Sequence, residues 1–267
     1  MKLKLCDAKS LDIVKTFECG QCFRWNANDK GVYTGVVGRY LAEVETVDNE
    51  VYITSDAPAE MWADYFDLAT DYAAVSAGFT GEYLHECIDY GMGIRILRQD
   101  SWEALCSFII SQCNNITRIK GIVERLCEQF GDKCEANGVG YYTFPSAERL
   151  AALRPSDLSG IRAGYRAEYI ITAARAVTTG ELDLDALKTC DYREAIKTLR
   201  QIRGVGEKVA NCVVLFGLYH MEAFPIDVWM KRALKEHFPA DFDPTSLGAY
   251  AGLAQQYIFY YSRSGGK

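Results

Sequence analysis

The chain has 267 residues, of which 49% are hydrophobic and 24% are charged, and its formal net charge at pH 7 is −7. This composition is typical of a globular protein with a sizeable hydrophobic core, and it excludes the disordered and fibrous classes. The acidic balance argues against a protein that binds nucleic acid through its overall charge. One segment has the opposite charge from the chain as a whole: residues 193–208 carry five basic side chains and two acidic ones.

No apolar run is long enough for a membrane-spanning helix, and the N-terminal sequence turns polar at once. We therefore expect a cytoplasmic protein, associated with the nucleoid if it is bacterial. The ten cysteines indicate reduced thiols rather than a disulfide framework. Cys19 and Cys22 form the only Cys-x-x-Cys pair, and no second pair follows at zinc spacing, so we expect no metal site built from side chains.

The first 56 residues predict β-structure. Runs of β-branched and aromatic residues are separated by turn residues, and the alternation around Val44 predicts an antiparallel sheet with one solvated face. From residue 59 to the end, the spacing of the apolar residues is helical. The predicted strands are 32–37, 40–47 and 51–54, with turns at 38–39 and 48–49.

These patterns predict an α+β fold. We expect a small N-terminal antiparallel β-sheet domain with flanking helices over residues 1–92, followed by an all-helical domain over residues 93–267. The sequence Gly-Met-Gly at 91–93 marks the boundary. The helical domain is expected to contain a helix-hairpin-helix at 192–218 and a loop that ends at Asp227.

The patterns of three other segments can each be explained by ordinary local structure. Residues 17–25 are typical of an apolar approach to a first strand, with Gly20 at a turn. Residues 102–130 predict two helices joined near 111–115, where asparagines would cap the second helix. Residues 163–169 are typical of a helix start whose aromatic side chains pack in a core.

The hairpin brings two polar residues together. Gly204 and Gly206 leave backbone N–H groups uncovered at the start of a helix, which is a favourable place for phosphate. A helix over 206–217 would rise about 18 Å. Residues 219–226 can span up to about 28 Å, so the chain can return Asp227 to the side of Lys208. Asp227 is also a good N-cap for the helix that follows.

The string Ile-x-Gly-Val-Gly-x-Lys-Val-Ala, with the Asp of Pro-Ile-Asp-Val nineteen residues after the Lys, resembles the helix-hairpin-helix glycosylases of base-excision DNA repair. Gly-Gln-x-Phe-Arg-Trp at 20–25 resembles their 8-oxoguanine DNA glycosylase branch. The resemblance extends over five separated segments between residues 17 and 260. It implies a bifunctional DNA glycosylase and AP lyase that acts on duplex DNA containing oxidised guanine.

The resemblance also implies roles for residues of the base pocket. Lys208 would attack C1′ of the deoxyribose, displace the base and form a Schiff base that permits β-elimination. Asp227 would stay anionic and stabilise positive charge that develops on the sugar. The remaining implied contacts are the Gly20 carbonyl with N7–H of the lesion, Gln255 with its Watson–Crick edge, and Phe259 and Cys212 with its two faces.

For the DNA around the lesion, the resemblance implies that Arg118 and Arg166 contact the orphaned cytosine and that Tyr165 enters the duplex as a wedge. Asn115 would organise the loop before Arg118. The hairpin residues expected to bind phosphate are Gly204, Val205 and Gly206, and a cation held by the backbone carbonyls of Arg200, Ile202 and Val205 would assist them.

Three positions depart from the family pattern. Arg203 stands where many members have Pro, Cys113 where the family often has Asn, and Trp229 where the animal enzymes have His. A thiol cannot hydrogen-bond a base edge as an amide can, so the preference for cytosine opposite the lesion is open, as is the role of Trp229. The four-cysteine cluster of several relatives is absent, so we expect no iron–sulfur cluster and no required cofactor.

Two other functions remain open at this point. A monofunctional alkyl-base DNA glycosylase would share the architecture and Asp227 but would not need Lys208. A non-catalytic DNA-binding protein would need the hairpin but not the residues of the base pocket. For each of these functions the expected partner is double-stranded DNA, and we expect a monomer without a membrane association.

Overall fold

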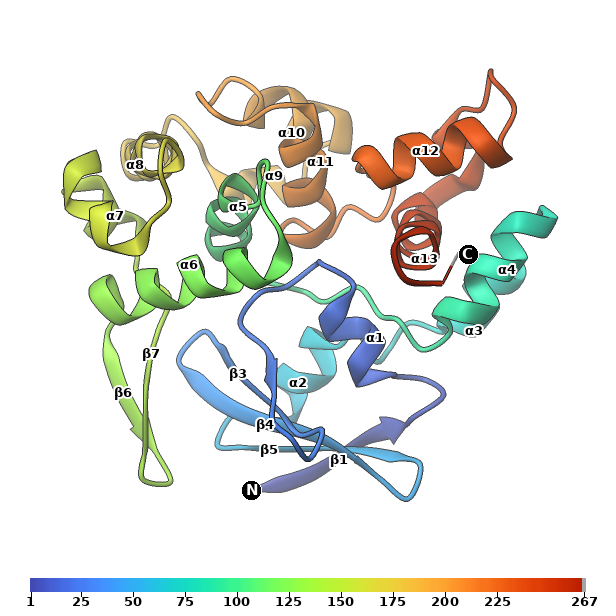
Figure 1. Ribbon diagram of the computed structural model, residues 1–267, viewed down its shortest axis with the longest axis horizontal. Helices are drawn as coiled ribbons and strands as arrows, with labels where there is room; N and C mark the ends of the chain where they lie inside the picture. Colours follow the sequence, from blue (N-terminus) through green and yellow to red (C-terminus); the bar gives the residue numbers. More distant parts are fainter. Residues whose placement is uncertain (266–267) are drawn as a thin grey trace.

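The computed structural model describes residues 1–265 and contains two hydrophobic cores (Figure 1). The smaller core lies between one face of an antiparallel sheet and helices α1 (Ile13–Glu18) and α2 (Ala59–Tyr65). The sheet has the strand order β1-β5-β4-β3-β2. Its strands are β1 (Lys2–Asp7), β2 (Asn26–Ala27), β3 (Tyr33–Val37), β4 (Tyr40–Val47) and β5 (Glu50–Ser55).

The predicted antiparallel sheet is confirmed. In β4, Ala42 and Val44 are buried while Glu43 is exposed, as a sheet with one solvated face requires. Asp48 and Asn49, between β4 and β5, both have positive φ angles, the geometry of a tight hairpin turn. The prediction of β-structure alone over residues 1–56 was incomplete, because α1 interrupts it and is capped by the side chain of Asp12.

The larger core is built from helices that cover the upper part of the molecule in Figure 1. The α-helix α5 runs through its centre and is almost wholly buried. The helices are α3 (Tyr72–Ala77), α4 (Glu82–Gly91), α5 (Ser101–Ile110), α6 (Ile116–Phe130), α7 (Ala147–Ala151), α8 (Arg166–Thr178), α9 (Leu184–Leu187), α10 (Tyr192–Leu199), α11 (Glu207–Phe216), α12 (Val228–His237) and α13 (Ala251–Ser264), with short 3₁₀ segments at Pro155–Ile161 and Pro244–Tyr250.

The prediction of an all-helical region after residue 59 was wrong at one place. Strands β6 (Lys133–Ala136) and β7 (Val139–Tyr142) form a two-stranded hairpin that extends beside the sheet in Figure 1. Asn137 and Gly138 both have positive φ angles, and this Asn-Gly pair was the hairpin signal in the sequence. The Tyr141 hydroxyl donates to the carbonyl oxygen of Arg39 at 2.7 Å, which ties the hairpin to the sheet.

The two cores do not divide at a single point of the chain. Helices α3 and α4 precede residue 92, yet Leu84 and Cys87 pack in the larger core, where α4 lies against α13. Leu97 follows residue 92 and packs in the smaller core. The division into domains at residue 92 therefore stays a prediction, and the chain crosses between the cores on both sides of it.

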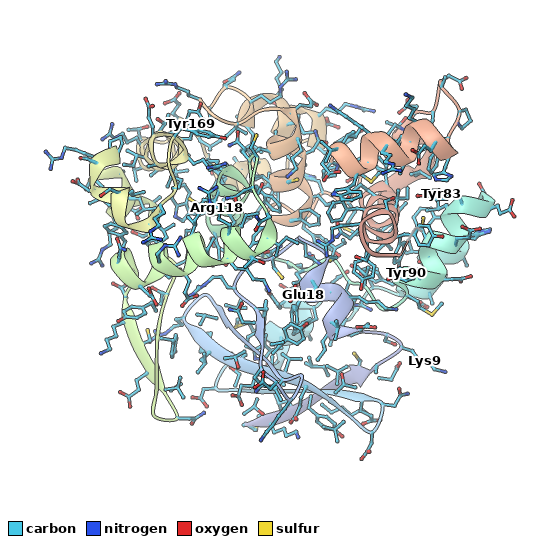
Figure 2. All side chains as sticks on the ribbon, in the orientation of Figure 1. Lys9, Glu18, Tyr83, Tyr90, Arg118 and Tyr169 are labelled. Atoms are coloured by element: carbon cyan, nitrogen blue, oxygen red, sulfur yellow. The ribbon has the colours of Figure 1, made fainter. Side chains whose placement is uncertain are left out.

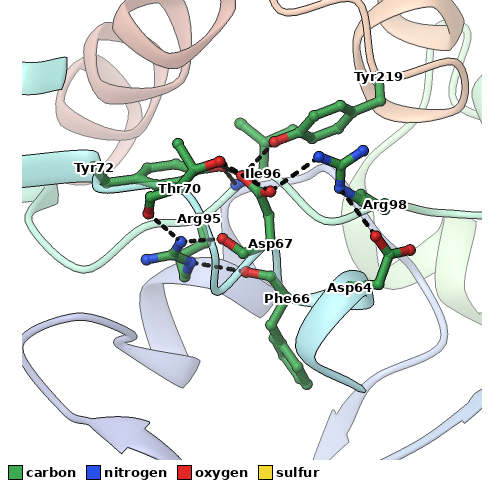
Figure 3. Close-up of polar contacts among 9 residues, drawn as sticks. All are labelled: Asp64, Phe66, Asp67, Thr70, Tyr72, Arg95, Ile96, Arg98 and Tyr219. Atoms are coloured by element: carbon green, nitrogen blue, oxygen red, sulfur yellow. Dashed lines mark hydrogen bonds and ion pairs between the residues drawn. The ribbon is translucent and has the colours of Figure 1, made fainter. Parts of the chain in front are cut away.

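A buried polar network joins the segment after α2, beside the smaller core, to the segment between α11 and α12 (Figure 3). Asp67, which is 2% exposed, accepts hydrogen bonds from the hydroxyl groups of Tyr72 and Tyr219 and from Arg98. The Arg98 guanidinium carbon lies 3.6 Å from the centroid of the Tyr219 ring. Burial raises the pKa of both tyrosines, so both phenols remain protonated donors.

Tyr219→Phe removes one donor from the buried Asp67 carboxylate. We expect the free energy of unfolding to fall by about 1–3 kcal/mol, since a buried carboxylate loses one of its donors. Tyr52→Phe is the matched control, because the Tyr52 hydroxyl meets the partly exposed Glu50 at 3.3 Å, and it should change that free energy by less than about 0.5 kcal/mol. Urea unfolding followed by tryptophan fluorescence measures both, and equal losses would contradict the prediction.

Candidate active site

A small cavity of about 50 Å³ lies where α11, α13 and the turn after α1 meet. Its walls come from the turn after α1, from α5, α11 and α13, and from the segment just before α12. The structure places in this one cavity all six residues predicted for the base pocket and the chemistry. The lining residues are Cys19, Gly20, Phe108, Lys208, Cys212, Phe216, Pro225, Asp227, Gln255, Gln256 and Phe259.

Lys208 occupies the first turn of α11 and is partly buried. Its Nζ donates to the Ser111 hydroxyl at 3.3 Å and lies 5.7 Å from the centroid of the Phe108 ring. Ser111 donates its own proton to the Phe108 carbonyl at 2.8 Å, so an oxygen lone pair is left for the amine. Ser111 was not predicted as a site residue, because nothing in the local sequence pattern connects it with a residue 97 positions away.

Asp227 is the N-cap of α12, as predicted. One of its carboxylate oxygens accepts from the backbone N–H groups of Trp229 and Met230, both at 2.9 Å. The second oxygen accepts no hydrogen bond from residues 1–265. The cap fixes the orientation of the carboxylate and leaves one oxygen for a positive charge in the cavity.

Cys212 and Gln255 form apolar and polar parts of the wall. Burial raises the pKa of the Cys212 thiol, so it is a neutral, compact surface one helical turn after Lys208. Gln255 is 4% exposed, and its amide oxygen has no hydrogen-bond partner in the part of the chain that the structure describes. An unpaired buried acceptor costs about 1–3 kcal/mol, which favours a site that receives a donor from a ligand.

The turn at Gly20 is fixed from α13. Gln256 donates to the Cys19 carbonyl at 2.7 Å, and Arg263 donates to the Glu18 carbonyl. A Cβ atom on Gly20 would lie 3.5 Å from the Phe259 ring, so the turn borders the ring directly. Gln256 and Arg263 were missed in the sequence, although their spacing around Phe259 places all three near one face of a helix.

The rest of the motif around Gly20 builds the core rather than the cavity. Gln21 is fully buried, donates to the Arg95 carbonyl at 2.8 Å and accepts from the Leu97 amide at 2.9 Å. Trp25 donates its indole N–H to the Tyr65 hydroxyl at 2.8 Å. The contacts of Gln21 join the turn to residues 94–100, the segment before α5, and this fixes the position of Gly20 beside the cavity.

The helix-hairpin-helix is formed by α10 and α11. Gly204 has a φ of 91°, and a Cβ there would lie 2.2 Å from the Tyr169 ring, so only glycine fits. Val205 is buried, and its N–H donates to the Ile202 carbonyl at 2.9 Å. The Gly204 carbonyl accepts from Gln112 at 3.0 Å, which links the hairpin to the loop after α5.

The predicted junction near residues 111–115 is the loop between α5 and α6. Asn115 caps α6 and accepts from the Arg118 amide at 2.9 Å. The Arg118 side chain is exposed on the first turn of α6, and Figure 2 labels it on the helical half of the molecule. Cys113 is exposed and has a φ of 47°, an uncommon conformation for a residue other than glycine.

Tyr165 and Arg166 lie in contrasting surroundings at the start of α8. Tyr165 is 53% exposed, as a side chain that enters another molecule must be. Arg166 is 4% exposed, and its guanidinium donates to backbone carbonyls of the loop between α5 and α6. Its contact with a base stays a prediction. Trp229 is 38% exposed on the first turn of α12.

The described residues contain neither a cluster of metal-ligating side chains nor a membrane-spanning helix. Within residues 1–265, no three His, Cys, Asp or Glu side chains are grouped so that they could hold a metal ion. Over the same residues, the structure has no helix with the length and apolar character needed to span a membrane. All ten cysteines are free thiols.

Two family models match consecutive parts of the chain. Residues 4–105 match the model described as 8-oxoguanine DNA glycosylase, N-terminal domain. Residues 106–252 match the model described as HhH-GPD superfamily base excision DNA repair protein. The N-glycosylase/DNA lyase of Saccharomyces cerevisiae is 37% identical over 55% of this chain, and that match spans only 42% of the yeast protein.

Two solved structures resemble the whole chain. MBOgg1 in complex with a low affinity DNA ligand is 38% identical with a TM-score of 0.91, and the match covers 100% of this chain and 96% of that one. The 8-oxoguanine glycosylase/lyase of Clostridium acetobutylicum, solved with double-stranded DNA containing cytosine opposite 8-oxoG, is 34% identical with a TM-score of 0.90. That match covers 100% and 99% of the two chains.

The burial of the thiols predicts their reactivity. Cys113 is exposed, whereas burial raises the pKa values of Cys19 to about 11 and of Cys212 in the cavity wall. A thiol reagent at neutral pH should therefore modify Cys113 first, and Cys212 only after unfolding. Mass spectrometry of the labelled peptides measures the order. The fastest phase should vanish in Cys113→Ser, and its persistence there would contradict the assignment.

Proposed function

The chain belongs to the HhH-GPD superfamily of base-excision DNA repair proteins, and we propose that it is an 8-oxoguanine DNA glycosylase with AP lyase activity. The observation that carries the proposal is the single cavity that contains Lys208 and Asp227 together with Gly20, Gln255 and Phe259. It supplies a nucleophile and an anion at one wall and groups suited to a purine at the others.

Recognition begins with a flipped base in the cavity. Guanine N7 is a hydrogen-bond acceptor, whereas N7 of 8-oxoguanine carries a proton. The Gly20 carbonyl accepts from that proton, and with guanine two acceptors would face each other without a partner. Gln255 pairs its free amide oxygen with the Watson–Crick edge. Phe259 and Cys212 contact the two faces of the ring.

The chemistry follows from Lys208. Its unprotonated amine attacks C1′ as the bond from C1′ to the base breaks, and the base leaves with the bonding electrons. The amine, now bonded to C1′, loses a proton, and the sugar ring opens as the C1′–O4′ bond breaks and O4′ takes up a proton, which gives the Schiff base. Loss of a C2′ proton from this Schiff base then expels the 3′ phosphate by β-elimination. Asp227, oriented by two backbone N–H groups, stabilises the positive charge that develops on the sugar.

Contacts outside the cavity hold the opened duplex. Tyr165 projects from the surface as a wedge, and Arg118 extends from the first turn of α6 toward the orphaned base. The Val205 N–H is used by the Ile202 carbonyl, so the Gly206 amide and the first amides of α11 bind phosphate, assisted by a cation on the carbonyls of Arg200, Ile202 and Val205. The Ile202 carbonyl already accepts one hydrogen bond from Val205 and keeps a second lone pair for such an ion.

The position of Lys208 separates the proposal from the two other functions. An alkyl-base glycosylase that activates water has no need of an amine against the base pocket, and it would not nick DNA. A non-catalytic DNA-binding protein has no need of a buried Gln255 with a free acceptor. Strand nicking at the lesion therefore separates the proposed function from the two others.

Lys208→Gln keeps a side chain of similar length and removes the nucleophile. We expect it to abolish both 8-oxoguanine excision and borohydride trapping on lesion DNA, while duplex binding is retained. Lys197→Gln is the matched control, since it removes the same charge from the exposed surface of α10. Trapping that persists in Lys208→Gln, or disappears in both variants, would contradict the role of Lys208.

Cys113 sets the expected preference for the opposite base. Excision of 8-oxoguanine placed opposite each of the four bases should show a weak preference for cytosine, because a thiol does not read a base edge. Cys113→Asn should raise the ratio of rates opposite C and A by about 5- to 150-fold, the equivalent of 1–3 kcal/mol for a base-edge contact. Asparagine also suits the positive φ at this position.

The control for this prediction is Cys134→Asn, on the β6–β7 hairpin, which should leave the ratio unchanged. Single-turnover rates on the four duplexes give the ratios directly. A strong preference for cytosine in the unmodified protein, or a ratio unaffected by Cys113→Asn, would show that this position does not determine opposite-base specificity.

A further inference from the structure

Side chains of α13 hold the turn that precedes Gly20. Gln256 donates to the Cys19 carbonyl at 2.7 Å, and Arg263 donates to the Glu18 carbonyl. These two carbonyls belong to successive planar peptide groups, so one helix holds both peptide planes before Gly20. Gly20 itself has a φ of 79°, which a residue with a side chain rarely adopts.

The Gly20 carbonyl is the free acceptor of this turn. It receives no hydrogen bond from any group within residues 1–265. The carbonyl that follows it, on Gln21, accepts from the Gln99 side chain at 2.8 Å. A free carbonyl thus stands between held neighbours, on a residue that lines the cavity. Because peptide groups are planar, holding the neighbours restricts the direction in which this carbonyl points.

Arg263 also meets the aromatic wall of the cavity. Its guanidinium carbon lies 5.5 Å from the centroid of the Phe259 ring, within the range of a cation–π contact. A Cβ atom on Gly20 would lie 3.7 Å from Arg263 Nη1 and 3.5 Å from the Phe259 ring, so the three groups pack together. Arg263 is not among the residues that line the cavity. It therefore acts on a bound base through the turn and the ring.

Stability alone does not explain this guanidinium. Arg263 Nη1 is buried and has no hydrogen-bond partner in the part of the chain that the structure describes. A buried N–H group without an acceptor destabilises a fold. A side chain of similar length without N–H groups would avoid that cost, so the arginine is better explained by the geometry that it gives to the turn.

We propose that Gln256 and Arg263 determine base specificity as positioning residues: they aim the Gly20 carbonyl at the N7–H group of the flipped base and hold Phe259 beside it. At N7, 8-oxoguanine differs from guanine by one proton, so discrimination there depends on where the carbonyl stands. This inference rests on the proposed function and concerns how its base pocket is aligned. Lys208 stands on α11, so loss of these contacts should weaken recognition of the base and spare the chemistry of the amine.

The experiment compares Gln256→Met, Arg263→Met and Arg263→Lys with the unmodified protein. Gln129→Met and Arg39→Met are the matched controls, because both side chains are exposed and lie outside the cavity. Single-turnover excision of 8-oxoguanine opposite cytosine, borohydride trapping on a preformed abasic site and thermal midpoints are measured for each protein. In a Lys208→Gln background, dissociation constants are measured for duplexes that carry 8-oxoguanine, guanine or a tetrahydrofuran abasic analogue.

Gln256→Met and Arg263→Met should each lower 8-oxoguanine excision about 10- to 100-fold, as expected for a recognition group displaced by about 1 Å. Trapping on the abasic site needs the amine but no base, so its rate should stay within about threefold of the unmodified protein. The preference in affinity for 8-oxoguanine over guanine should fall by about 10-fold, while affinity for the tetrahydrofuran duplex is retained. Arg263→Lys, which keeps one donor for the Glu18 carbonyl, should recover part of the excision rate.

An unchanged excision rate in both methionine variants would overturn the proposal. Equal losses of excision and trapping would overturn it as well, because they would indicate a general structural role. If Gln256→Met does not fold, Arg263→Met decides: a loss of excision without a loss of trapping supports the proposal, and no loss contradicts it. Failure of the unmodified protein to excise 8-oxoguanine would instead refute the proposed function.

Discussion

A buried hydrogen bond between Gln256 and the Cys19 carbonyl joins residues 237 positions apart at a distance of 2.7 Å. It holds the turn of Gly20 against α13, the helix that also carries Gln255 and Phe259. This contact keeps segments from the two ends of the chain together at the cavity. Arg263 supports the same turn through the Glu18 carbonyl, so the wall of the pocket has two anchors on one helix.

The opposite wall is fixed in a comparable way. Lys208 and Asp227 stand at the starts of α11 and α12, and the segment between these helices is tied down at its beginning by Tyr219 and the buried Asp67. Asp227 is then held by the N–H groups of its own helix. Each polar group is oriented by backbone or by a buried partner, so the site is organised before any ligand arrives.

One buried group without a partner lies in the cavity, and one residue with uncommon backbone geometry lies in the loop beside it. The buried Gln255 oxygen lacks a donor, and Cys113 has a positive φ in the loop that touches Lys208. Such features cost stability unless a ligand or a neighbour compensates them. The Cys113 carbonyl accepts from Arg166 at 3.2 Å, whereas the Gln255 amide oxygen has no donor within residues 1–265.

Much of the fold followed from local sequence. Alternating residues and turn signals located β3, β4 and β5, and apolar spacing located α5, α6 and α11. The residue count between Lys208 and Asp227 allowed these two residues to meet, and the resemblance of the whole string to the glycosylase family led to the prediction that they share a site. The hairpin of β6 and β7 was missed despite its Asn-Gly turn, because its strands have only four residues each and none of these residues is buried.

Only the tertiary structure decided which polar side chains line the cavity and which ones hold distant backbone segments together. Gln21 and Gln255 have the same chemistry, but the first is satisfied by backbone from the segment before α5 and the second faces the cavity unpaired. Ser111 and Gln256 act through partners far away in the chain. Local periodicity records which face of an element is buried, but hydrogen bonds between distant segments depend on how those elements pack, and only the folded chain defines them.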